Sequence, residues 1–289
     1  MNSIKQAYRD FLNTPEGVAL YRQFKKLLYA RQDSLVQWLN NSVLLTLPAA
    51  RKLNVRVCDI GGGDGGRITR ILQFLQGKFK NRFRLDFIEQ SALYVSEFKP
   101  QPLTPFCRIT INHGLFEDAK LTVGNYDLVL LIHSIFAFEN GDSTRKVLDL
   151  RRTDGNIVIV SNAPNSFLGG LKRLTDTDYS DKRFEIDDLK QSLRKSGVDF
   201  RQQTTFTEWA IDKKTWKRDI GIILNWISLG RYDSLPKRQQ MEIQDYVRRR
   251  GKKNGSRTFF KEEEIVLTIP DLRRNRSESA ETSINLNTA

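Results

Sequence analysis

A run of glycines flanked by carboxylates is the feature of this sequence that most clearly indicates chemistry. Asp59 is followed by Ile60 and then by five glycines among six residues, with Asp64 inside the run. Glycine can adopt positive φ and lie flat against a ligand, and a helix that follows such a loop points free N–H groups at it. A purely structural turn would not need so many glycines. The loop therefore predicts a site for a nucleotide-like cofactor.

Two cofactors are compatible with this loop. Gly61, Gly63 and Gly66 have the dinucleotide spacing, in which a pyrophosphate rests on a helix N-terminus. The two loop carboxylates would repel a pyrophosphate, whereas they suit a ligand that carries an ammonium and a sulfonium. We therefore expect S-adenosylmethionine, with a nicotinamide dinucleotide as the alternative. The expected cofactor-binding residues are Asp59, Gly61, Gly63, Gly65 and Glu89, the last of which can bind both ribose hydroxyls.

Candidates for the methyl-transfer chemistry follow the fourth predicted strand. In an open α/β sheet the substrate lies beyond the carboxyl ends of the strands, and His133 stands at that end of strand 126–134. A histidine can take a proton near neutral pH, although His133 could also simply line a pocket. Phe136, on the next segment, is a candidate substrate contact. Glu16 is a second catalytic candidate, and it is equally an ordinary acid of a first helical turn.

The elements that must position these residues alternate along the chain. Apolar runs predict strands at 55–60, 83–89, 108–113, 126–134 and 155–162, and the three-to-four spacing that starts at Arg67 predicts a helix. Such alternation favours right-handed βαβ units. We expect a doubly wound α/β fold, with a mostly parallel seven-stranded sheet, an N-terminal helical lid and a helical insert before the last strand.

The chain divides into three expected parts. Residues 1–47 form a helical cap, residues 48–270 form the cofactor-binding domain, and residues 271–289 form a disordered tail with almost no apolar side chains. Within the domain, 163–181 is predicted as a loop with at most one helical turn, and 185–196 as a helix. A helical insert at about 213–250 separates the last two strands, which should therefore pair antiparallel as a hairpin.

Composition limits the partners. The net charge is +13, so an RNA or protein acceptor is the alternative to a small molecule, although no appended nucleic-acid domain is evident. The densest basic block, 248–253, is predicted as a solvated loop between a helix and a strand, with a specific anion site as the alternative. Two cysteines and two histidines provide neither zinc spacing nor a disulfide framework, so no metal is expected. Without a signal peptide or a membrane-length apolar run, we expect a cytoplasmic monomer.

Several segments together resemble the histamine N-methyltransferase family of class I methyltransferases. They are YRDFLN near the start, IGGGDG, IEQSA, IHSIF, and FEIDDLKQSLRKSGVDF, spread over residues 4–269. The resemblance implies S-adenosylmethionine-dependent methylation of the nitrogen of a small amine. It also implies that the cofactor is bound by the glycine loop, Glu89 and the residues after the third and fourth strands, namely His113, Gly114, Leu115, Phe116, Ile132 and His133.

The same resemblance implies an amine pocket, with departures from the family. The family's substrate contacts fall on Tyr8, Glu16, Phe167 and the run from Glu262 to Glu264. The family's paired tryptophans become Phe167 and Leu171, and its amide near the last strand becomes a glutamate. These changes reshape the pocket, so the acceptor is expected to differ from histamine. A cofactor-binding protein without catalysis is a third alternative, which the intact glycine loop disfavours.

Overall fold

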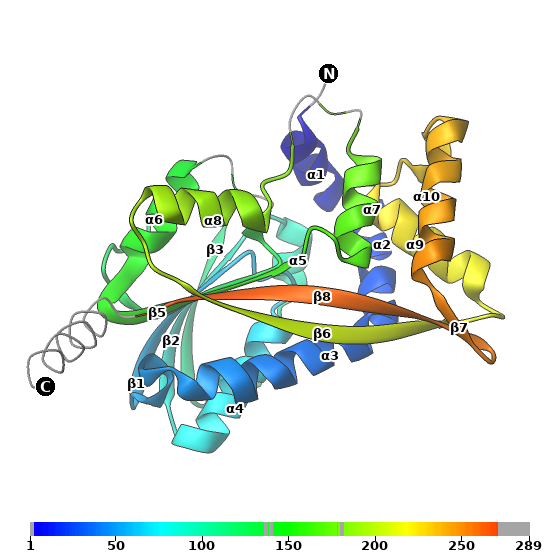
Figure 1. The fold of residues 1–289 in the computed structure, drawn as a ribbon. Helices are drawn as coiled ribbons and strands as arrows, with labels where there is room; N and C mark the ends of the chain where they lie inside the picture. Colours follow the sequence, from blue (N-terminus) through cyan, green and yellow to red (C-terminus); the bar gives the residue numbers. More distant parts are fainter. Residues whose placement is uncertain (1–2, 136–137, 139–140, 178, 180–181, 271–289) are drawn as a thin grey trace, which may run out of the picture.

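The computed structural model describes residues 3–135, 138, 141–177, 179 and 182–270. Its strands form one sheet in the order β3-β2-β1-β4-β5-β8-β6, and a short β7 pairs with β8 (Figure 1). The predicted α/β class and mostly parallel sheet are confirmed, and the short β7 adds an eighth strand to the seven that were predicted. The strands are β1 Asn54–Ile60, β2 Arg82–Glu89, β3 Cys107–His113, β4 Tyr126–Ile132, β5 Arg151–Asn162, β6 Arg201–Asp212, β7 Lys252–Asn254 and β8 Arg257–Ile269.

Pairing directions place the carboxyl ends of five strands along one edge. The strands β3, β2, β1, β4 and β5 run parallel to one another, whereas β8 pairs antiparallel with both β5 and β6. The predicted hairpin of the last two long strands is therefore confirmed. Because β4 is buried at every position and apolar from Leu128 to Ile132, it can occupy the centre of the sheet.

Helices cover both faces of the sheet. On one face, α3 and α4 pack over apolar side chains such as Val57 and Leu85, and on the other α6 and α8 pack over Cys58 and Ile159. Beyond the strand ends, α1, α2, α7, α9 and α10 gather around a separate aromatic core that contains Trp226 (Figure 1, right). The α-helices are α1 Ile4–Leu12, α2 Pro15–Leu27, α3 Tyr29–Trp38, α4 Gly66–Phe79, α5 Ala92–Glu97, α6 Gly141–Leu150, α7 Phe167–Thr175, α8 Ile186–Lys195, α9 Trp216–Ile227 and α10 Lys237–Arg250.

The prediction of a loop at 163–181 is wrong in its middle, where α7 forms. Ser166 caps this helix by accepting the Gly169 N–H. Gly169 and Gly170 made the segment resemble a loop, but both are used for close packing. A Cβ on Gly170 would lie 2.1 Å from the Tyr246 hydroxyl oxygen of α10. Gly170 therefore lets α7 and α10 approach each other, which only the tertiary structure reveals.

The prediction of a loop for the basic block is wrong for its second half, whereas its first half lies in the helical insert that was predicted to extend to about residue 250. Arg248, Arg249 and Arg250 form the last turn of α10, and Lys252 and Lys253 belong to β7, which pairs with β8. Strand pairing, which depends on residues distant in sequence, orders this segment. The predicted tail, 271–289, lies outside the described residues. Across the ranges that the structure describes, no helix is both long and apolar enough to span a membrane.

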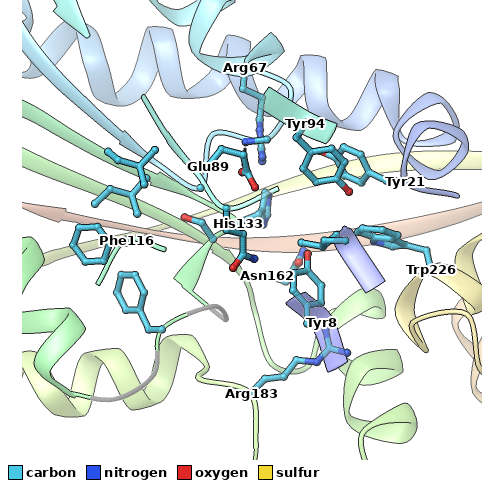
Figure 2. Close-up of a pocket in the computed structure, with 18 of the residues that line it drawn as sticks. Tyr8, Tyr21, Arg67, Glu89, Tyr94, Phe116, His133, Asn162, Arg183 and Trp226 are labelled. Carbon is cyan, nitrogen blue, oxygen red and sulfur yellow. Dashed lines mark hydrogen bonds between the residues drawn. The ribbon is translucent and has the colours of Figure 1, made fainter. Parts of the chain in front are cut away.

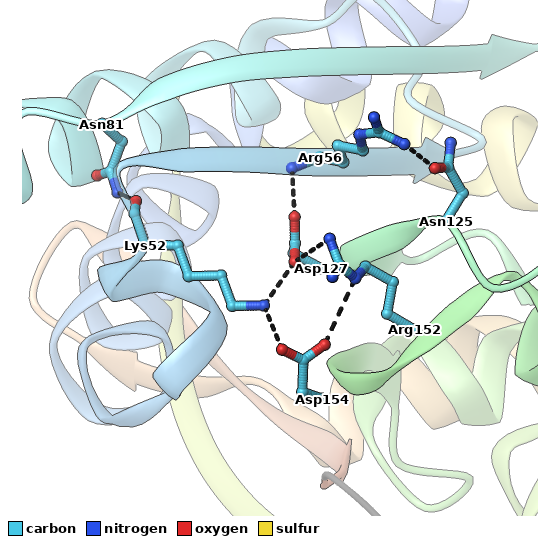
Figure 3. Close-up of polar contacts among 7 residues, drawn as sticks. All are labelled: Lys52, Arg56, Asn81, Asn125, Asp127, Arg152 and Asp154. Carbon is cyan, nitrogen blue, oxygen red and sulfur yellow. Dashed lines mark hydrogen bonds and ion pairs between the residues drawn. The ribbon is translucent and has the colours of Figure 1, made fainter.

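A charged network ties the strands together at their amino ends (Figure 3). Asp127 of β4 is 1% exposed, and its carboxylate accepts hydrogen bonds from Lys52 Nζ at 2.7 Å and from the backbone N–H of Arg56 at 2.8 Å. Lys52 also reaches Asp154 of β5 at 2.8 Å. Since these residues come from separate elements, the network fixes β1, β4 and β5 at the edge opposite to the glycine loop.

Replacing Asp127 with alanine should lower the free energy of unfolding by about 2–4 kcal/mol, because Lys52 and the Arg56 N–H would lose their partner. Urea unfolding measures this difference. The matched control is Asp245→Ala, whose side chain is 58% exposed and pairs with the exposed Arg248. The control should change the free energy by less than about 0.5 kcal/mol. Equal effects of the two substitutions would contradict the structural role of Asp127.

Candidate functional site

The glycine loop crosses the carboxyl end of β1 as a tight turn. Gly61 and Gly63 have φ of 69° and 62°, values that favour glycine. The N–H groups of Gly61 and Gly62 donate to the Ile88 carbonyl of β2 at 2.9 and 3.1 Å. A Cβ on Gly61 would lie 2.5 Å from the Ser134 Cβ. Both conformation and space therefore require glycine here, and the result is a flat backbone surface open to a ligand.

Glu89 joins this loop to the end of β2. Its Oε2 accepts the Gly63 N–H and its Oε1 accepts the Ser91 N–H, each at 2.8 Å. Burial raises the pKa of Glu89 above its ordinary value, and these two N–H donors act in the opposite direction. A carboxylate fixed in this way, at the rim of a glycine cradle, can accept hydrogen bonds from two hydroxyls of a sugar.

The two acids of the loop differ in environment, and neither presents a free charge to the pocket. Asp59 is 5% exposed and lies beneath Gly62, and burial raises its pKa to about 7. Asp64 forms an ion pair with Lys25 of α2. Burial would raise the pKa of Asp64, but the Lys25 ammonium outweighs it, so the pKa is below its ordinary value. The sequence argument that Asp64 attracts a cationic ligand is therefore wrong, because Lys25 neutralises it.

A single pocket extends from the loop to the helices above the sheet (Figure 2). In this view Arg67 reaches down from α4 toward Glu89, while Arg183 marks the opposite end. The predicted residues that line the pocket are Tyr8, Gly61, Gly63, Glu89, Gly114, Leu115, Phe116 and His133. Residues from α1, from the glycine loop and from the ends of β2, β3 and β4 thus meet in one cavity.

His133 occupies the middle of this pocket in an unusual backbone conformation. Its φ is 58°, and its N–H donates to the Val160 carbonyl of β5 at 2.8 Å. His133 Nε2 lies 3.5 Å from Oε2 of Glu264, whose other carboxylate oxygen pairs with Arg31. Burial, and then the charges of Arg31, Arg67 and Lys172, lower the pKa of His133 well below its ordinary value. The imidazole is therefore neutral at pH 7.

Several predicted site residues do not line this pocket. Asp59 is beneath the loop, Gly65 faces the Phe98 ring, and Ile132 packs in the apolar core. His113, at the end of β3, is exposed. Glu16 is also exposed, in the first turn of α2, where it suits the helix N-terminus. Phe136 lies outside the described residues.

Phe167 and Glu262 are structural in this arrangement. Phe167 is 1% exposed and packs against the rings of Trp209, Tyr246 and Phe260. Glu262 is fully buried and accepts hydrogen bonds from the Leu168 N–H of α7 at 3.2 Å and from Asn162 Nδ2 at 3.0 Å. Burial raises the pKa of Glu262 to about 7. Its carboxylate therefore stabilises the start of α7, and it is not presented to a ligand.

Sequence reasoning missed other residues of the pocket wall. Asn162 ends β5 at the same edge as His133, so the strand-end rule could have identified it. Lys172 and Arg183 were hidden because their surroundings were predicted as a loop. The remaining wall residues could not have been identified from local sequence patterns. They are three aromatic residues of the upper wall, Tyr21, Tyr94 and Trp226, and one cation, Arg67. Within the described part of the chain, no group of His, Cys, Asp and Glu residues is arranged to hold a metal ion.

Comparison with known proteins supports the fold. The YcgJ protein from Bacillus subtilis matches with a TM-score of 0.51 and 14% identity, over 83% of this chain and 97% of its own. A candidate methyltransferase from Bacillus halodurans C-125 matches with a TM-score of 0.50 and 14% identity, over 80% and 99%. No protein-family profile and no curated protein matches the sequence. The chain has the Rossmann-like fold of class I methyltransferases.

Proposed function

We propose that this chain is an S-adenosylmethionine-dependent methyltransferase that acts on a small molecule. The observation that carries the proposal is the continuity of one pocket, from the glycine cradle and Glu89 to His133 and Tyr8. Gly61, Gly63, Glu89 and the 114–116 segment would hold the cofactor. When bound, it would supply a methyl group that its sulfonium already activates. The resemblance to the histamine N-methyltransferase family and the fold support this assignment.

The enclosure of the pocket supports a small acceptor. Tyr8 and Leu12 of α1, Tyr21 of α2 and Trp226 of α9 close it above the strand ends. Phe24 and Tyr21 pack on Trp226 at ring-centroid distances of 5.5 and 5.0 Å, so α2 is fixed against the insert. We therefore propose that residues 1–47 act as a lid on a 48–270 domain, with the helical insert at 213–250 as its support. Monomeric state and cytoplasmic location are further parts of this proposal.

We propose an amine nitrogen as the methyl acceptor. An ammonium has no lone pair, so the amine must be neutral when the N–C bond forms and the C–S bond breaks. A neutral His133 can accept a hydrogen bond from the amine N–H and hold the lone pair toward the methyl group. Glu16 and Glu262 were both expected to contact the amine. Glu16 lies on the surface, and Glu262 lies under α7, where it accepts a hydrogen bond from the Leu168 N–H. Recognition of the amine thus rests on His133, Asn162 and Tyr8.

Calorimetry tests the cofactor, and label transfer tests the acceptor class. S-adenosylhomocysteine should bind with a saturable heat, and NAD should give none up to millimolar concentration. With methyl-labelled S-adenosylmethionine, label should enter amines in a small-molecule pool. NAD binding without a response to S-adenosylhomocysteine would contradict the cofactor assignment. Label found only in RNA or protein would contradict the small-molecule acceptor.

A further inference from the structure

Three arginines form a row across β1, β2 and β3. Arg56 is in register with Arg84, and Arg84 is in register with Arg108. Neighbouring strands lie about 4.8 Å apart, and residues in register on parallel strands point to the same face, so the row extends over roughly 10 Å. This is the face that α6 and α8 cover elsewhere, because Cys58, two positions after Arg56, packs in the core beneath those helices.

No helix covers the arginine row within the described residues. The connection from β3 to β4, residues 114–125, contains no helix, whereas a crossover between parallel strands usually supplies one. Helix α6 packs instead on β4 and β5. Arg84 and Arg108 are therefore exposed, and a hollow of about 330 Å³ remains on the sheet. Its wall consists of Arg56, Arg84, Leu85, Asp86, Arg108, Thr110, Asn125 and Tyr126.

The charge of the row is largely unopposed by neighbouring side chains. In the part of the chain that the structure describes, Arg84 and Arg108 form no ion pair. Arg56 donates a hydrogen bond to the side-chain oxygen of Asn125, which carries no charge (Figure 3). Like charges side by side on neighbouring strands are destabilising. An anion bound between the arginines would relieve this repulsion.

Asp86 offsets only part of the positive charge. Among the described residues that line the hollow it is the only carboxylate, and it accepts a hydrogen bond from the Tyr126 hydroxyl at 2.8 Å. Three arginines against one carboxylate leave a net charge of +2 on the wall. A ligand with two or more negative charges would therefore match the hollow electrostatically.

We propose that this hollow binds an oligophosphate, either inorganic or carried by a nucleotide. The guanidinium fork binds phosphate oxygens through paired hydrogen bonds, and an oligophosphate presents such oxygens along a chain that can reach successive arginines of the row. Single-stranded nucleic acid fits less well, because its bases stack on aromatic faces. Tyr126 is the only aromatic residue among the described residues of the wall, and it is 2% exposed. The hollow lies toward the amino ends of the strands, away from the glycine loop, so binding there does not depend on the proposed function.

Calorimetry with inorganic triphosphate on the full chain, at an ionic strength of about 0.15 M, tests this site. Triphosphate should bind saturably, and about tenfold or more tightly than orthophosphate, because it can contact more than one arginine. Uridine triphosphate, which lacks the adenine of the expected cofactor, separates the two sources. Binding as tight as that of triphosphate would indicate a nucleotide, and much weaker binding would indicate an inorganic oligophosphate.

Variants locate the binding on the row. Arg84→Gln, in the middle of the row, should weaken triphosphate binding about tenfold or more. Arg84→Lys should weaken it less, because lysine keeps the charge and loses the fork. Arg108→Gln is an independent variant at the end of the row. The matched control is Arg201→Gln, an exposed strand arginine of β6 outside the hollow, which should bind triphosphate normally. Thermal melting shows whether each variant is folded.

Four results would overturn the oligophosphate site. They are the absence of triphosphate binding, binding of orthophosphate as tight as that of triphosphate, losses in Arg84→Gln and Arg108→Gln that are no larger than the loss in Arg201→Gln, and binding of a single-stranded oligouridylate more tightly than triphosphate. The third result would show that only the overall charge of the protein attracts the anion, and the fourth would identify the row as a nucleic-acid surface.

Discussion

Replacing His133 with asparagine is expected to lower methyl transfer by about 100-fold or more and to leave the affinity for S-adenosylhomocysteine nearly unchanged. His133 lies between the cofactor cradle and the acceptor half of the pocket, and its pKa is well below the ordinary value because it is buried near three cations. Its neutral ring can therefore orient an amine by accepting an N–H. Asparagine tolerates the positive φ of this position, so the variant should fold.

The control and the pH profile make this prediction specific. His113→Asn changes the only other histidine, which is exposed and outside the pocket, and should keep normal turnover. Because the pKa of His133 is lowered, the activity that depends on neutral His133 should persist at pH 6.5 and fall only at clearly lower pH. The acceptor amine, in contrast, should make kcat/KM rise with pH until it is neutral. Full activity of His133→Asn, or equal losses in both variants, would contradict the assigned role.

Replacing Glu89 with alanine is expected to weaken S-adenosylhomocysteine binding by about 10- to 100-fold, or ~1–3 kcal/mol. Two losses combine in this variant. The ribose hydroxyls lose their acceptor, and the Gly63 and Ser91 N–H groups lose the carboxylate that fixes the loop. Calorimetry measures the affinity, and thermal melting shows whether the variant is folded.

The control for Glu89 is a glutamate away from the pocket. Glu208→Gln, on the exposed side of β6, should leave the affinity unchanged. Glu89→Gln should fall between wild type and Glu89→Ala, because its amide keeps one acceptor oxygen but turns a donor toward other donors. If Glu89→Ala bound S-adenosylhomocysteine with unchanged affinity, the cofactor would not lie on the glycine loop and Glu89. The proposed cofactor site would then be wrong.

The missed parts of the site share a cause. Lys172 and Arg183 are separated from Tyr8 by more than half the chain, and they meet it only because α7 and the segment before α8 fold back over α1. Glu16 and Glu262 were expected in the amine pocket because of the family resemblance, but sequence does not show which way a carboxylate points. The buried Glu262 accepts a hydrogen bond from the Leu168 N–H, and Asp64 is neutralised by Lys25.

The α/β class, the mostly parallel sheet and the tight glycine turn at the end of β1 could all be predicted from the amino-acid sequence. These features depend on local signals, because glycine conformation, apolar periodicity and strand-end position act within a few residues. The helix α7, the pairing of β7 and the identity of the charged groups that face the pocket became evident only in the folded chain. Those depend on contacts between residues far apart in the chain, such as Gly170 with Tyr246 and Arg31 with Glu264. Burial then sets the protonation of His133 and Asp59, because only the folded chain removes them from water.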